Sequence, residues 1–297
     1  MKQLTPKGIW EGHQRTRPAR YKKEMRKLRK ILHKLLPDIA QTTSAREETL
    51  FSGIMILIYK AQYGLSYRDL ATESSLSKRM RTMCNLDSES GKSKLFYRAR
   101  AVASIKKEFL DEILRQFASD ANCNDIHGDS TGISTSKYED WNHAKYGKIS
   151  KHGFVKLHTL TAMGSKILAF NVTDAHAHDS PVFRQMMKNI PSGTGIITLD
   201  SAYDAYINCK MIVDTGRRPV IKPKSNSKVK GYSPRAKMVR WYQKDPASFL
   251  LAYGKRNLVE SEFSSIKERT GVMVYAKSLV TQTAELFARV LYYNLIV

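Results

Sequence analysis

Four side chains near the carboxyl end of the sequence have a spacing that suits chemistry on phosphate groups. They are Tyr253, Arg256, Glu260 and Lys267, which lie three, four and seven residues apart. In a helix these separations are close to whole turns, so the four side chains share one polar face on which cations flank a carboxylate. A simpler interpretation is a surface ion pair between Arg256 and Glu260, which would contribute only about 0.3–0.5 kcal/mol.

Two aspartates upstream lie in or directly after segments that are expected to form strands. Asp200 follows the apolar run of residues 195–199, which is typical of a strand buried on both faces. Asp129 lies within or near the end of a glycine-punctuated strand expected over residues 124–134. The sequence therefore offers three separate acidic groups that a fold could bring to one place.

The pattern Tyr-x2-Arg-x3-Glu-x6-Lys resembles the signature of the DDE transposases of bacterial and archaeal insertion sequences, and this chain matches it at all four positions. The resemblance covers roughly residues 45–297. It implies that Asp129, Asp200 and Glu260 are the catalytic and metal-binding carboxylates.

Each aspartate has a rival in the sequence. Asp129 is preferred to Asp125 because the family's first motif is an aspartate followed by a small hydroxyl residue, and Asp200 is preferred to Asp204 because the apolar strand ends at it.

Three carboxylates in one place repel one another unless cations neutralise them. Ligation by oxygen atoms alone suits Mg²⁺ or Mn²⁺. Two such ions per active site would activate the attacking oxygen and stabilise the leaving oxygen of an in-line displacement at phosphorus. A neighbouring pair, His176 and His178, is weaker evidence for a metal site, and a polar loop before a helix is the simpler interpretation.

The charge balance predicts a polyanionic partner. The chain has 50 Lys and Arg against 27 Asp and Glu among 297 residues, a net charge of +23, which favours double-stranded DNA, as element ends and as target. The residues expected to contact DNA are Tyr253, Arg256, Lys267, Lys222, Lys224, Arg68, Arg98 and Arg100. No apolar run approaches the roughly 18–20 residues of a membrane span, and no signal peptide is seen, so a cytoplasmic, nucleoid-associated protein is expected.

The order of elements predicts an α/β fold: a ribonuclease H-like mixed sheet flanked by helices, preceded by an all-α N-terminal DNA-binding region. Residues 1–120 are expected to form the basic, helix-turn-helix-like region. Residues 121–297 are expected to form the catalytic domain, with an insertion at about 223–250. Within this insertion Trp241 is expected to pack, or else to stack on a displaced base.

Several local features are also predicted. Pro37 should stop a first helix, Ser44 should open a capping box with Glu47, and Ser66 should cap a short helix with Asp69 as its third residue. Asp179 should start another helix by the cap-then-proline rule. A basic, aromatic loop is expected over residues 137–152.

The resulting hypothesis is a transposase that binds the terminal inverted repeats of its element, cleaves the element ends and joins them to target DNA. The resemblance implies a homodimer that pairs the two ends. The alternatives are a catalytically inactive DNA-binding relic and a ribonuclease H-like nuclease or resolvase that only hydrolyses.

Overall fold

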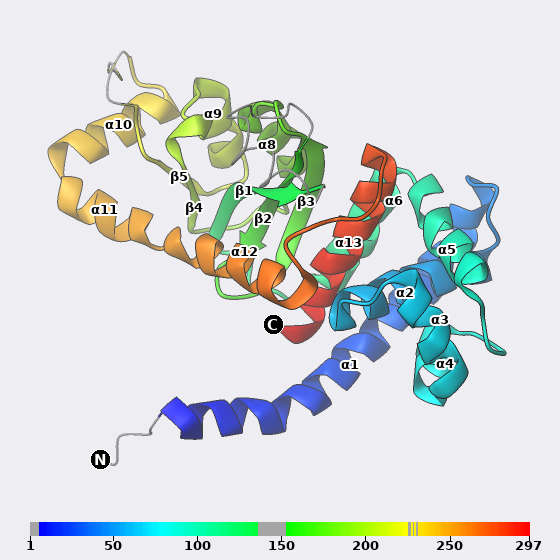
Figure 1. Ribbon diagram of the computed structural model, residues 1–297. Coiled ribbons are helices and arrows are strands. Elements are labelled where there is room, and N and C mark those ends of the chain that lie inside the picture. Colours follow the sequence, from blue (N-terminus) through cyan, green and yellow to red (C-terminus); the bar gives the residue numbers. More distant parts are fainter. Residues whose placement is uncertain (1–5, 136–152, 225–226, 228, 230) are drawn as a thin grey trace, which may run out of the picture.

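A computed structural model describes residues 6–135, 153–224, 227, 229 and 231–297, with side chains from residue 18 onward. The loop expected over residues 137–152 lies outside the described residues. The described chain combines a five-stranded mixed sheet with helices on both of its faces (Figure 1). Among the described residues, no helix combines the length and the apolar character needed to cross a membrane.

Helices form the described part of the chain before the first strand. They are α1 (Pro6–Gln41), α2 (Glu47–Tyr63), α3 (Tyr67–Leu76), α4 (Lys78–Cys84), α5 (Lys92–Ala101), the 3₁₀ turn η1 (Val102–Ser104) and α6 (Lys107–Phe117). The most apolar of them is α2, in which residues 54–59 are all buried, as expected for a core helix.

Two of the predicted local features are wrong in this region, and a third is confirmed. Helix α1 continues through Pro37 to Gln41, because Leu36 and Ile39 on either side are fully buried and their packing outweighs the roughly 3 kcal/mol cost of an internal proline. Helix α2 begins after Arg46 without a side-chain cap, so Ser44 forms no capping box. The box of Ser66 and Asp69 is present in full.

The sheet consists of β1 (Ile126–Ser134), β2 (Phe154–Ala162), β3 (Ile167–Asp174), β4 (Ile196–Leu199) and β5 (Arg218–Ile221). Its strand order is β3-β2-β1-β4-β5. The first three strands form an antiparallel meander, and β4 and β5 run parallel to β1. The tight turn between β2 and β3 uses Gly164 at φ +66°, where a residue without a Cβ is favoured.

Helices follow and interrupt the later strands. They are α8 (Asp179–Met187), the 3₁₀ turn η2 (Ser201–Tyr203), α9 (Tyr206–Asp214), α10 (Pro234–Lys244), α11 (Pro246–Gly254), α12 (Asn257–Thr270) and α13 (Leu279–Ile296). The insertion expected at about residues 223–250 holds α10, which Ser233 caps and Pro234 begins in the manner favoured at helix starts.

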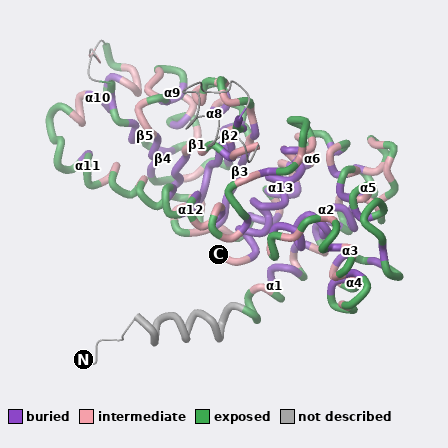
Figure 2. Tube along the Cα trace, viewed as in Figure 1, coloured by how far each residue is buried: buried purple, intermediate pink, exposed green. Residues whose placement is uncertain are grey.

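Two hydrophobic cores cover the two faces of the sheet. One face packs on α8, α9 and α10. The other packs on α12, α13 and α6, and its core continues without a break into α1, α2 and α5. The boundary predicted between residues 120 and 121 therefore separates a helical region from the sheet region, and one hydrophobic core extends across it. Figure 2 shows buried residues along α2, α13 and the sheet, whereas α11 is largely exposed.

Candidate active site

Asp129 lies on β1, and Asp200 directly follows the neighbouring parallel strand β4, at the same level of the sheet. Ile126 of β1 is paired with Ile197 of β4, and three residues further along each strand lead to Asp129 and Asp200. Neighbouring strands lie about 4.8 Å apart. The Asp200 carboxylate accepts a hydrogen bond from the backbone N–H of Ala202 at 2.8 Å, which fixes it at the start of η2.

The polar residues from Tyr253 to Lys267 were expected on one continuous helix, but they lie on two. Helix α11 ends at Gly254, and α12 begins at Asn257. Gly254 is the weakest helix former of this segment, which accounts for the break. The two linking residues keep right-handed backbone angles, and the N–H of Arg256 donates to the carbonyl of Tyr253 at 2.9 Å. The chain therefore stays on a helical path, and α11 and α12 follow one another in Figure 1.

Arg256 links two of the three predicted catalytic carboxylates. Its Nη2 donates to Oδ2 of Asp129 at 2.5 Å, and its Nη1 lies 3.6 Å from Oε1 of Glu260. The guanidinium is mostly buried, and its Nε has no hydrogen-bond partner among the described residues. Glu260 is 67% exposed, and its ion pair among the described residues is with Arg256.

Burial and charge act in opposite directions on Asp129. Burial raises the pKa of the Asp129 carboxyl, and the negative charge of Asp200 acts in the same sense, while Arg256 and the N–H of Ser130 oppose the rise. Burial also raises the pKa of Tyr253, against the opposing effect of Arg256. The electrostatic interaction between Asp129 and Asp200 indicates that the two carboxylates share one environment.

The donor set suits a hard divalent cation, but the described arrangement does not yet form a complete metal site. All three candidate groups are carboxylates, which Mg²⁺ and Mn²⁺ prefer. Among the described residues, no three His, Cys, Asp or Glu side chains are grouped closely enough to hold a metal ion. Asp129 and Asp200 fit such an ion by position and chemistry, whereas Arg256 separates Glu260 from them.

A buried network that the sequence did not suggest holds α12 against the sheet. His127 of β1 lies 3.1 Å from Glu262, and Thr161 of β2 donates to the same carboxylate at 2.7 Å. All three side chains are buried. Glu262 is two residues after Glu260, and His127 is two residues before Asp129, so this network fixes the relative positions of the strand and helix that carry the site.

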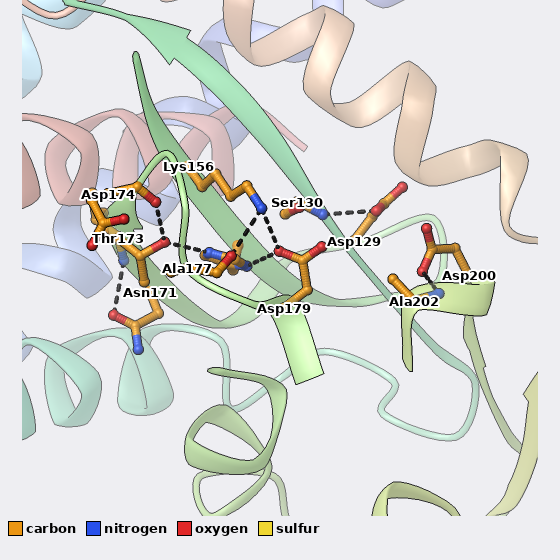
Figure 3. A network of polar contacts seen from close by, with 12 residues as sticks. Asp129, Ser130, Lys156, Asn171, Thr173, Asp174, Ala177, Asp179, Asp200 and Ala202 are labelled. Carbon is orange, nitrogen blue, oxygen red and sulfur yellow. Dashed lines mark hydrogen bonds and ion pairs between the residues drawn. The ribbon is translucent and has the colours of Figure 1, made fainter. Parts of the chain in front are cut away.

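Four further residues near the two aspartates were also missed: Asp179, Lys156, His158 and Tyr203. Asp179 was expected to cap α8, yet its carboxylate makes no cap and is 3.2 Å from the Lys156 ammonium. Figure 3 shows Asp179 and Lys156 in the same part of the site as Asp129 and Asp200.

Burial raises the pKa of Tyr203 well above its usual value, and the charges of Asp179, Asp129 and Asp200 all add to that rise. One signal for this group was the presence of Lys156 and His158 in a strand that also carries four large apolar side chains.

The rival aspartates have structural partners elsewhere. Asp125 accepts from the N–H of Ile196 at 3.0 Å and pairs with Lys255 at 3.1 Å. Asp204 has no exposed side-chain surface and binds Arg235 at 2.7 Å. The contacts of Asp125 and Asp204 give both residues a structural role.

The remaining residues predicted to contact DNA lie in three places. Lys267 is in the last turn of α12, and burial lowers its pKa. Lys222 and Lys224 are exposed after β5. Arg68 and Arg100 are exposed on α3 and α5, whereas Arg98 is half-buried and donates to Ser52 at 2.8 Å. The structure therefore brings only Tyr253 and Arg256 close to the aspartates.

Two weaker candidates also have observed surroundings. Trp241 packs edge-on against Phe249 at 4.9 Å between ring centroids, and the Arg218 guanidinium lies 4.0 Å from its ring. His176 and His178 are exposed and line a cleft of about 470 Å³ next to Asp179.

Comparison with known proteins identifies a matching family and similar solved structures. A family model described as a transposase DDE domain matches residues 127–295, which is 169 of the 297 residues. No curated protein is matched. A cryo-EM structure of a piggyBac transposase synaptic complex with hairpin DNA is similar at a TM-score of 0.41 and 11% identity. That likeness covers 84% of this chain, which spans 65% of the other one.

Proposed function

Since this chain belongs to the transposase DDE domain family, we propose that it is the transposase of an insertion sequence. It binds the terminal inverted repeats of its element, cleaves the element ends and joins them to target DNA. The observation that carries this proposal is the placement of Asp129 and Asp200 at one level of neighbouring strands, with Arg256 bound to Asp129 and 3.6 Å from Glu260 of α12.

The sheet supports a ribonuclease H-like fold for the catalytic part. It consists of an antiparallel meander of three strands, followed by two strands parallel to the first. Because β1 and β4 are neighbours, residues 71 positions apart in the chain meet at one edge. This topology explains how two distant aspartates serve one site.

Asp129, Asp200 and Glu260 are the proposed metal ligands, for two Mg²⁺ or Mn²⁺ ions per active site. When bound, such ions activate the attacking oxygen and stabilise the leaving oxygen of a displacement at phosphorus. Arg256 and Lys267 hold the negative non-bridging oxygens of the DNA phosphate. Before DNA arrives, Arg256 neutralises Asp129, which limits the repulsion between the carboxylates.

The partners follow from the same proposal. The exposed cations Arg68, Arg100, Lys222 and Lys224 contribute contacts to double-stranded DNA, and a homodimer pairs the two element ends. The net charge of +23 supports a polyanionic partner.

The test is cleavage of labelled DNA that carries the element's own ends, with Mg²⁺ or Mn²⁺. Glu260→Gln should slow nicking at the repeat boundary by at least about 100-fold, because a carboxylate essential to charge stabilisation is lost. DNA binding should persist. Glu268→Gln, an exposed change on the same helix, is the matched control and should cut like the unaltered protein.

The alternatives give different results in the same assay. Cleavage without joining of the freed 3′ end to a target duplex would identify a hydrolytic nuclease or resolvase. If the unaltered protein and Glu260→Gln both bind the ends and neither cuts, the chain is a DNA-binding relic.

A further inference from the structure

A basic groove lies between α1 and α6, far in sequence from the carboxylates. It has a volume of about 620 Å³ and is lined by Lys23, Arg26, Lys27, Lys30, Ile31, Arg115, Gln116 and Ser119. Five of these eight residues are cations and none is an acid. The α1–α6 groove, defined by this lining, lies within the N-terminal region expected to bind DNA, but it includes none of the eight side chains that were singled out as DNA contacts.

The acidic groups around the groove are already engaged. Glu24 is buried and accepts from the Lys166 ammonium at 2.6 Å, and Asp120 binds both Lys166 and Lys27 at 2.9 and 2.8 Å. Glu112 binds Arg115 at 2.6 Å. These ion pairs also connect α1, α6 and β3, so the groove is held in place by the fold.

Three cations of the groove remain without an acidic partner in the described part of the chain. Lys23, Arg26 and Lys30 are exposed, and none of them forms an ion pair there. Their spacing of three and four residues aligns them along one side of α1 over about 10.5 Å, at 1.5 Å per residue. One strand of duplex DNA carries a negative charge about every 3.4 Å along the axis, so this line faces about three phosphates.

We infer that the α1–α6 groove binds the sugar–phosphate backbone of double-stranded DNA. The inference rests on the proposed function, which supplies DNA as the partner, and the charge of the groove selects the backbone as the part bound. Ammonium and guanidinium groups neutralise phosphates without reading bases. The groove therefore contributes sequence-independent affinity, separate from any base recognition by the helices around Arg68.

The test measures how binding of a labelled duplex of arbitrary sequence depends on salt between about 50 and 200 mM. The slope of log K against log salt is negative, and each lost phosphate contact makes it shallower by about 0.9. The triple change Lys23→Gln, Arg26→Gln, Lys30→Gln should therefore make the slope shallower by about 2.7 and weaken binding about 10²-fold at 0.1 M salt.

Two controls accompany it. Lys23→Arg, Arg26→Lys, Lys30→Arg keeps every charge and should retain the slope. Lys188→Gln, Lys237→Gln, Lys244→Gln removes three exposed cations elsewhere and should leave the slope nearly unchanged. An unchanged slope in the groove variant, or an equal fall in the Lys188, Lys237 and Lys244 variant, would overturn the inference.

Other outcomes separate this inference from the proposed function. If the groove variant binds DNA normally but changes its sedimentation coefficient, the groove is a contact between copies and the inference fails. A groove variant that still nicks element ends at saturating protein, yet shows the reduced slope, supports both. If the unaltered protein cuts element ends but the groove variant keeps its full salt slope, the proposed function is supported and only the inference about the groove is overturned.

Discussion

Two aspartates separated by one helical turn follow β4, and their contacts differ completely. Asp200 is half-exposed beside Asp129, and its carboxylate accepts a single backbone N–H in the first turn of η2. Asp204 accepts hydrogen bonds from Nε and Nη2 of Arg235 and from the hydroxyl of Ser227. The Arg235 partner lowers the pKa of Asp204, although burial opposes this. The first arrangement leaves oxygen atoms available for ligands, and the second does not.

Replacing each aspartate by asparagine should therefore separate catalysis from stability. Asp200→Asn should abolish metal-dependent cleavage and change the free energy of unfolding by less than about 0.5 kcal/mol, since asparagine retains the contact to Ala202. Asp204→Asn should destabilise by about 3 kcal/mol, because it leaves Arg235 without its charge partner. Denaturant unfolding and end cleavage of both variants check this, and the reverse pattern would make Asp204 the catalytic residue.

His158 predicts a pH dependence of stability. Its side chain is fully buried between Thr173 and Asp179, and burial lowers its pKa from 6.5 to about 4, with Lys156 adding to the effect and Asp179 opposing it. Between these values the unfolded chain binds a proton that the folded chain does not bind. The free energy of unfolding should therefore fall as the pH falls from about 6.5 to about 4, by up to about 3 kcal/mol in total.

Denaturant unfolding at several pH values measures this effect. His158→Gln should flatten the curve within that pH window relative to the unaltered protein. His178→Gln, at an exposed position, should leave the curve unchanged. A curve for His158→Gln that parallels the unaltered one would assign the pH dependence to other groups.

At the scale of elements, the crossing of α2 and α5 depends on a glycine. A Cβ built on Gly53 would lie 2.2 Å from the carbonyl oxygen of Arg98 and 2.9 Å from a methyl group of Val102. The first contact is with backbone, so one of the helices would have to move. Gly53 therefore sets how closely α5 packs on the largely buried helix α2.

Gly53→Ala should destabilise the protein by about 1–3 kcal/mol, although alanine is the better helix former by about 1 kcal/mol. Gly254→Ala is the matched comparison, because nothing lies within 4 Å of its Cβ position at the end of α11. It should leave the free energy of unfolding unchanged or raise it. Equal effects of the two changes in denaturant unfolding would show that α2 and α5 separate at little cost.

At the scale of the whole molecule, α13 connects the N-terminal helices to the sheet. It packs on α2 and on β3, which is an edge strand. The buried side chain of Asn294 accepts from the N–H of Ile167 at 2.8 Å and donates to its carbonyl at 2.9 Å. One side chain thus satisfies both backbone groups of Ile167, at the start of that edge strand.

Asn294→Leu should destabilise the protein by about 2–4 kcal/mol, because two buried backbone groups lose their partners at about 1–3 kcal/mol each. Val280→Ala, on the exposed side of the same helix, should change the free energy of unfolding by less than about 0.5 kcal/mol. Thermal or denaturant unfolding of both variants measures this. A small effect of Asn294→Leu would mean that water replaces the lost contacts.

The elements and several site residues follow from local pattern alone. The apolar run before Asp200, the glycine-punctuated strand of Asp129 and the spacing of Arg256 and Glu260 each depend on residues within a few positions. Such patterns determine which segment becomes a strand, a turn or a helix face, because backbone periodicity acts over short separations. For this reason the strands expected over residues 124–134 and 195–199 are present as β1 and β4, close to the predicted bounds.

Only the tertiary structure decided which side chains meet. Arg256 and Asp129 are 127 residues apart, and His127 and Glu262 are 135 apart. The packing of α12 on the sheet brings each pair together, and no local spacing encodes it. The same holds for Asp179. Local pattern predicted that it caps a helix, whereas in the structure it forms an ion pair with Lys156 of β2. The sequence pattern thus identified the candidate site residues, and packing between distant segments determined which side chains they contact.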